Sequence, residues 1–242
     1  MLLDARPEPI TIDPERAALL VMDMQNDFGT KGGLFDRAGI DISQIQEAAA
    51  PTARVIAAAR RAGMKVIYLK MGFRPGFRPD LSDAGPKDSP NWIKHQAMHL
   101  GEAVQAPDGT QSRILIRDTW NTEIVSELKP HSDDIVIWKN RFSGFYQTEL
   151  DSVLKRLNAE VLVFTGCTTS VCVESTIRDA TFRDYSPVLL EDCTAEPIGH
   201  NLPTSNHDAS LLLIQCLFGW VSRSDQFIKA LETRPFTAAG RP

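Results

Sequence analysis

Residues 161–175 (VLVFTGCTTSVCVES) limit the possible folds of this chain more than any other segment. They begin with four apolar residues, which is the pattern of a strand buried on both faces of a parallel sheet. Small residues follow from Gly166, and Cys172 then stands at the expected start of a helix. Open α/β folds place their sites at the carboxyl ends of such strands. The segment therefore predicts a cysteine at a functional edge of a sheet.

Cys172 has two possible roles at this position. The free N–H groups and the positive dipole end of a helix N-terminus favour a thiolate, which suits a nucleophile. A free cysteine is also commonly a small buried hydrophobic residue. The segment alone leaves both roles open.

Apolar runs alternate with helical segments along the rest of the chain. We expect strands at 17–22, 65–70, 134–138 and 187–191, and helices at 51–63, 148–159, 202–220 and 224–232. This alternation predicts a three-layer α-β-α fold around a mainly parallel sheet. A chain of 242 residues can form one such domain, over residues 1–242.

Residues 71–110 depart from this pattern because they contain ten glycines and prolines. A connection this long is typical of a functional loop, so we expect a lid over the site. Its aromatic residues, Phe73, Phe77 and Trp92, either line a substrate pocket or anchor the loop, and Asn91 is a further candidate for substrate binding.

His95 and His99 lie four residues apart, a spacing that can bind a metal ion from one helix face. No acidic residue follows His95, and no other cluster of histidine and aspartate is apparent. We therefore expect no metal site and no cofactor, and we expect these histidines to be solvated or to pack within the loop.

Three reactive side chains follow expected buried strands: Asp23, Lys139 and Cys172. A carboxylate at the end of a buried strand is costly unless it has a partner or a function. Because parallel strands end at one edge of their sheet, we expect the three side chains to converge. A thiol, a carboxylate base, a cation and the N–H groups of a small-residue turn can together perform acyl transfer without a metal.

Composition excludes several classes of partner. The net charge is −5 and no basic cluster occurs, which argues against nucleic acid. No apolar run is long enough to cross a membrane, and the N-terminal residues do not resemble a secretory signal. Without a signal peptide or the spacing of a small disulfide-rich domain, we expect the four cysteines to be reduced thiols and the location to be cytoplasmic. They form no C-x-x-C pair, which argues against a redox or zinc-knuckle motif.

Three motifs resemble those of the isochorismatase-like cysteine hydrolases: LLVMDMQNDF around Asp23, WKNRFSGF around Lys139, and FTGCTTSVCVESTIRDA around Cys172. The resemblance implies a three-layer α/β fold and an Asp-Lys-Cys triad formed by these three residues. It also implies a cis peptide between Cys167 and Thr168, and an oxyanion hole formed by the backbone N–H groups of Thr168 and Cys172. Finally, it implies a homodimer or homotetramer.

Further stretches are similar to the ureidoacrylate amidohydrolase branch, namely ARPEPITIDP, GPKDSPN, VCVESTIRD and FGWVS. This similarity implies a metal-free amidohydrolase that cleaves a C–N bond of a small ureido or carbamoyl compound, such as ureidoacrylate, biuret or triuret, through a thioester. The alternatives are an amidase for another small amide, such as an N-carbamoyl amino acid or a nicotinamide-like compound, and a non-catalytic binding relative.

The substrate pocket is expected to depart from that branch. The branch has polar side chains near the positions held here by Met71 and Phe142, so the resemblance implies an altered pocket. Phe28 and Phe142 are candidates for substrate contacts. Gln215 is a candidate polar contact, and a surface position on its helix is equally compatible with the sequence.

Overall fold

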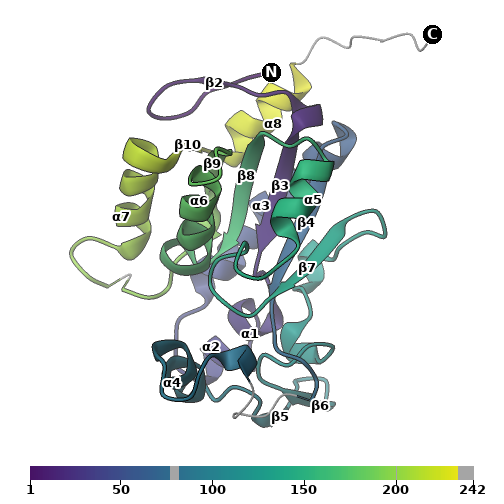
Figure 1. Ribbon diagram of the computed structural model, residues 1–242, viewed down its shortest axis with the longest axis vertical. Coiled ribbons are helices and arrows are strands. Elements are labelled where there is room, and N and C mark those ends of the chain that lie inside the picture. The colour runs from purple at the N-terminus through teal and green to yellow at the C-terminus, as the bar shows by residue number, and fades with distance from the viewer. Residues whose placement is uncertain (77–81, 200, 234–242) are drawn as a thin grey trace.

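Six parallel strands form the centre of the computed structural model, which describes residues 1–76, 82–199 and 201–233 (Figure 1). The strand order in this sheet is β10-β9-β8-β3-β4-β7. The strands are β3 (Ala17–Met22), β4 (Lys65–Met71), β7 (Ile135–Lys139), β8 (Val161–Cys167), β9 (Ser186–Ala195) and β10 (Trp220–Ser222). A separate short pair, β1 (Leu2–Leu3) and β2 (Ile10–Thr11), ties down the N-terminal arm.

Helices cover both faces of this sheet. α3 (Ser43–Arg61) and α8 (Ser224–Glu232) pack on one face, and α5 (Leu150–Arg156) and α6 (Glu174–Thr181) pack on the other, with α7 (Asn206–Leu213) beside α6. Alternate residues of β3 supply the two hydrophobic cores, because Leu19 and Val21 face α3 whereas Ala18 and Leu20 face α5. The predicted three-layer α/β fold is confirmed.

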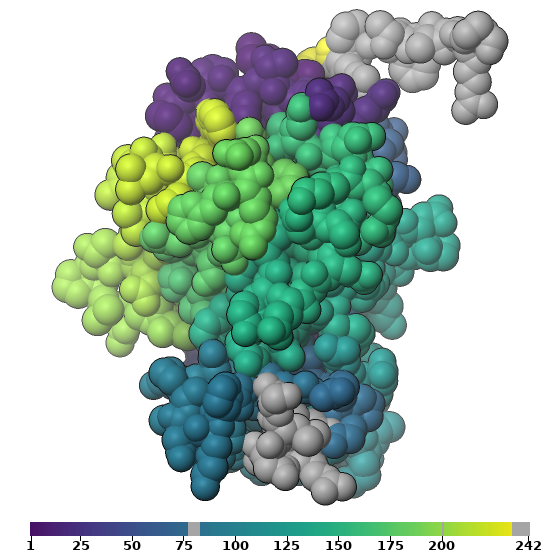
Figure 2. Space-filling view, in the orientation of Figure 1, coloured from purple at the N-terminus to yellow at the C-terminus, as the bar shows by residue number. Residues whose placement is uncertain are grey.

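Short elements lie beyond the carboxyl edge of the sheet. These are α1 (Asn26–Gly29), α2 (Leu34–Arg37), α4 (Pro90–Ala97), β5 (Ala103–Gln105) and β6 (Gln111–Arg113). In the space-filling view, the blue residues of segment 71–110 form the lower end of the molecule, beneath the green helices α5 and α6 (Figure 2). No helix in the described ranges has the length and apolar character needed to cross a bilayer.

Two predicted helices differ from the structure. α3 begins at Ser43 rather than at Pro51, so this proline lies inside the helix. Because proline lacks an N–H group, it is best tolerated in the first turn of a helix, and the sequence pattern therefore predicts a helix that starts at Pro51. The helix expected over residues 202–220 ends in a π-helical turn, Ile214–Phe218, and Gly219 then leads into β10. A strand of three residues has too little periodicity to be recognised.

Gly166 allows β8 to pack closely against β3. It has a φ of +109°, and a Cβ at this position would lie 2.0 Å from the carbonyl oxygen of Met22. The pairing of β8 with β9 also shifts register between Phe164 and Gly166. Only glycine fits this approach, and β8 therefore ends directly beside the residue that follows β3.

Candidate active site

The side chains of Asp23, Lys139 and Cys172 meet at the carboxyl edge of the sheet. Lys139 Nζ lies 2.7 Å from Asp23 Oδ2 and donates a hydrogen bond to Cys172 Sγ over 3.4 Å. The Lys139 ammonium group therefore contacts both the Asp23 carboxylate and the Cys172 thiol. All three residues are buried. The structure therefore places in one cluster three residues that are far apart in the sequence.

The backbone around Asp23 explains its position. Asp23 adopts a left-handed conformation with a φ of 52°, and its N–H donates to the carbonyl of Leu69 in the neighbouring strand β4. The Cys167 thiol donates to the Asp23 carbonyl over 3.2 Å. Cys167 thus stabilises the turn that carries Asp23, and its own burial raises the pKa of its thiol well above the usual value.

The turn between β8 and α6 presents the backbone of Cys172. Its first peptide, between Cys167 and Thr168, is cis, as expected. The residues Thr169–Val173 form a π-helical turn that continues into α6. Within this turn, the N–H groups of Val171 and Val173 both donate to the carbonyl of Thr168, so they are not available to a substrate oxyanion.

Burial dominates the protonation of the cluster. It raises the pKa of Asp23, although the charge of Lys139 opposes this shift. It raises the pKa of the Cys172 thiol to about 12, and Lys139 offsets this only in part. Burial would lower the pKa of Lys139, but the adjacent Asp23 and Cys172 reverse that effect and raise it. The resting site therefore holds a neutral Cys172 thiol beside the cationic Lys139, not the thiolate that the helix position favours.

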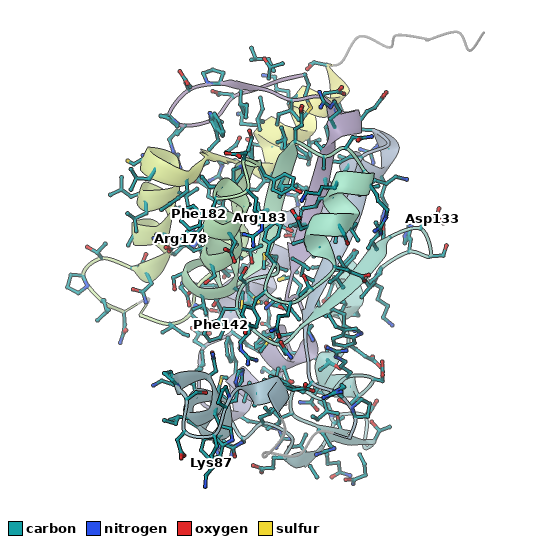
Figure 3. The ribbon with its side chains drawn as sticks, viewed as in Figure 1. Lys87, Asp133, Phe142, Arg178, Phe182 and Arg183 are labelled. Carbon is teal, nitrogen blue, oxygen red and sulfur yellow. The ribbon has the colours of Figure 1, made fainter. Side chains whose placement is uncertain are left out.

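A cavity of about 390 Å³ opens above this cluster. Asp23, Cys172 and Thr168 line it on one side, and most of the remaining lining is apolar. That remaining lining consists of Phe28, Phe35, Met71, Lys94, Ala97, Met98, Leu115, Phe142, Cys167, Val171 and Ile198. Figure 3 shows Phe142 between the body of the molecule and the α4 region. The cavity therefore offers a small molecule access to the Cys172 thiol.

The predicted substrate contacts have different outcomes. Phe28 and Phe142 line the cavity, and so does Met71. Phe73 is fully buried in the hydrophobic core, which fits an anchoring role, and it is not among the described lining residues. Asn91 and Trp92 are also not among the described lining residues, and Phe77 lies outside the described residues.

Gln215 is not among the described residues that line the cavity, and its position fits the helix-surface alternative. Gln215 lies in the π-helical turn after α7, where its side-chain oxygen accepts a hydrogen bond from Arg6 Nε over 3.1 Å. This exposed contact joins the N-terminal arm to the late helix. Helix periodicity could not identify which neighbouring segment this face of the helix would meet.

The two histidines of the lid segment have packing and surface roles. The His95 ring is buried and lies edge-to-face against Phe73, with 5.0 Å between ring centroids. His99 is exposed and pairs with Glu102. Across the described ranges, no group of three or more His, Cys, Asp or Glu side chains is arranged to hold a metal ion.

Some lining residues were not identified from the sequence. Lys94, Ala97 and Met98 all come from α4 and the residue after it. Their spacing of three and four residues places them on one helix face, which is a detectable signal. Glu196, which does not line this cavity, was also not identified, although it follows β9 at the same sheet edge as Asp23 and Lys139.

Comparison with known proteins adds to this geometry. The model of the isochorismatase domain matches residues 17–226. A ureidoacrylate amidohydrolase RutB from Variovorax paradoxus is 42% identical over 229 residues, which cover 95% of this chain and 86% of that protein. A second RutB, from Yersinia enterocolitica, is 40% identical over 231 residues, which cover 96% of each protein.

Solved structures share the same fold. A cysteine hydrolase from Pseudomonas syringae aligns with a TM-score of 0.74 and 28% identity, covering 96% of this chain and 97% of that one. An N-carbamoylsarcosine amidase from Thermoplasma acidophilum aligns with a TM-score of 0.63 and 25% identity, covering 87% of this chain and 97% of that one.

Proposed function

Because this chain belongs to the isochorismatase family, and because its relatives include ureidoacrylate amidohydrolases, we propose that it hydrolyses the C–N amide bond of a small ureido or carbamoyl compound. The observation that carries this proposal is the buried cluster of Asp23, Lys139 and Cys172 at one wall of a cavity. The reaction we propose needs no metal ion and passes through a thioester.

In the first half-reaction, Cys172 Sγ attacks the substrate carbonyl carbon while its proton passes to the Asp23 carboxylate. This proton transfer is needed because burial keeps the thiol neutral. The backbone N–H groups of Thr168 and Cys172 stabilise the negative oxygen of the tetrahedral intermediate. The C–N bond then breaks, Asp23 returns the proton to the leaving nitrogen, and ammonia or an amine departs from a Cys172 thioester.

In the second half-reaction, water replaces the leaving amine. Asp23 takes a proton from this water, and the resulting hydroxide attacks the thioester carbonyl. The C–S bond breaks, Sγ regains the proton from Asp23, and a carbamic or carboxylic acid leaves. Lys139 remains cationic throughout and holds the Asp23 carboxylate in place. We further propose that segment 71–110 acts as a lid, since Lys94 and Met98 contribute to the cavity wall.

A second candidate function is an amidase for a bulkier, more apolar amide, such as an N-carbamoyl amino acid. The apolar side chains of Met71 and Phe142 in the cavity wall favour it. Such a wall can bury an alkyl or aromatic substituent and offers few hydrogen-bond partners to a second ureido group.

The test is a screen for ammonia release from ureidoacrylate, biuret, triuret, N-carbamoyl amino acids and simple amides, since a carbamic acid product also decays to ammonia. We expect turnover of a ureido or carbamoyl compound by the wild-type protein. We expect none by a Cys172→Ala variant whose circular dichroism spectrum matches that of the wild type. An unimpaired Cys172→Ala variant, or inactivity of the wild-type protein on every compound, would overturn the proposal.

A further inference from the structure

Glu196 is a buried carboxylate at the edge of the sheet that carries the candidate triad. It follows the last residue of β9 and has an exposed fraction of 0%. Its Oε2 accepts from the backbone N–H of Ser170 over 2.8 Å and from the Ser170 hydroxyl over 2.6 Å. Its Oε1 accepts from the N–H of Ile198 over 3.0 Å. These partners are backbone and hydroxyl groups, which satisfy the carboxylate without a cation.

The two Ser170 contacts place Glu196 against the turn that presents the nucleophile. Ser170 lies between Thr168 and Cys172, whose N–H groups form the proposed oxyanion hole. The preceding residue, Thr169, is held from the same side, because its hydroxyl lies 2.9 Å from His207 Nδ1. Two consecutive residues of the turn are therefore held by the side chains of Glu196 and His207.

Glu196 also determines which N–H groups in the turn remain available. It occupies that of Ser170, while those of Val171 and Val173 donate to the Thr168 carbonyl. Without the carboxylate, the Ser170 N–H would be a partly buried donor that lacks its partner. The turn would then gain an alternative arrangement in which this donor points toward water or substrate.

On the basis of the proposed amidohydrolase function, we propose that Glu196 is a positioning residue of the oxyanion hole. It does not line the described cavity wall, so it acts through Ser170 rather than on the substrate. Its hydrogen bonds hold the 168–172 backbone so that the donors already face the developing oxyanion. Preorganised donors of this kind are worth about a hundredfold or more in kcat.

The experiment compares Glu196→Ala, Glu196→Gln and Glu196→Asp in a Cys216→Ser background, which removes the exposed thiol. We expect Glu196→Ala to lower kcat for amide hydrolysis at least about tenfold, with KM changed less than about threefold. Glu196→Gln retains an acceptor at the same reach and should recover part of kcat. Glu196→Asp retains the charge but moves it back by one methylene, so it should recover less than glutamine does.

A second readout separates positioning from general damage to the site. Alkylation of the Cys172 thiol by iodoacetamide displaces iodide at a saturated carbon and needs no oxyanion hole. We therefore expect the rate of Cys172 labelling in Glu196→Ala to remain close to that of the parent. If Glu196→Ala does not fold, the order of kcat between the glutamine and aspartate variants carries the test.

Asp192→Ala is the matched control. Asp192 lies on β9, the strand that Glu196 follows, and is not among the described cavity-lining residues. It accepts from the N–H and hydroxyl of Ser224 over 2.8 and 2.5 Å. We expect it to lose stability without losing kcat.

Three outcomes would overturn the role of Glu196: unchanged kcat in Glu196→Ala, equal loss of kcat and of Cys172 labelling, or an aspartate variant more active than the glutamine variant. Absence of amidase activity in the parent protein would instead count against the proposed function.

Discussion

The ammonium group of Lys139 lies 2.7 Å from the carboxylate of Asp23, and neither side chain is more than 1% exposed. Removing one member of a buried pair leaves the other charge uncompensated, which costs about 3–5 kcal/mol. We expect Lys139→Gln to lower the free energy of unfolding by about 3 kcal/mol and to abolish turnover. Urea denaturation and ammonia release measure the two effects.

Lys155→Gln is the control for this substitution. It breaks an exposed pair with Asp151, in which the two side chains are 71% and 34% exposed, and such pairs contribute less than about 1 kcal/mol. Equal losses of unfolding free energy in the two variants would show that the buried pair contributes no more to stability than the exposed pair.

The protonation of Asp23 predicts the pH dependence of activity. The proposed base must be ionised, and burial raises its pKa above the usual value of 3.8, so activity should fall with decreasing pH at a higher pH than for an ordinary aspartate. The pKa of Lys139 is raised above 10.5, so loss of its charge should not reduce activity near neutral pH. A profile of kcat/KM from about pH 4 to pH 9 tests both expectations. A profile that is flat down to pH 4 would contradict the role of Asp23 as the base.

Gly166→Ala tests the close approach of β8 to β3. A Cβ there would lie 2.0 Å from the Met22 carbonyl oxygen, at a φ of +109° that alanine disfavours. We expect a loss of at least about 3 kcal/mol in the free energy of unfolding, because backbone strain and a backbone clash combine. Gly76→Ala is the control, since a Cβ there meets no atom of the described residues within 4 Å, and it should change stability by less than about 0.5 kcal/mol. Thermal unfolding of both variants measures these effects. An unchanged stability of Gly166→Ala would contradict the predicted clash.

The triad geometry was accessible from sequence because it depends on topology. Asp23, Lys139 and Cys172 each follow an apolar run, and parallel strands deliver such residues to one edge without any knowledge of loop structure. Glu196 follows β9 by the same rule, but β9 extends four residues beyond the expected end at Glu191, so its position at the edge was not recognised.

The cavity wall was less accessible because it depends on packing between distant segments. Phe28 and Phe142 lie within the triad motifs, and both line the cavity. Met71 also lines it, from the end of β4. Gln215 lies on a helix whose neighbour is the N-terminal arm, and only the tertiary structure reveals this contact. The same limit applies to α4, where the pattern predicts a loop and the structure has a helix that presents Lys94 to the cavity.

Lys94 predicts how the protein distinguishes anionic from neutral substrates. It is the one lysine or arginine among the described residues that line the cavity, and its side chain is exposed to solvent. Because the rest of that wall is largely apolar, the ammonium group would favour a carboxylate on the substrate. We expect Lys94→Glu to lower kcat/KM for carboxylate-bearing ureides about tenfold and to leave neutral amides within about twofold, since one charge reversal acts on the anion alone.

Lys87→Glu is the control for the charge reversal at Lys94. It makes the same change in the same segment, at an exposed position that Figure 3 shows at the lower tip of the molecule. Its effect should be small and should disappear at about 0.3 M salt, because screening removes long-range interactions between exposed charges. The effect of Lys94→Glu should largely persist, since it acts at contact distance. Equal effects of Lys94→Glu on anionic and neutral substrates would instead indicate that α4 has moved and that Lys94 does not bind the anion.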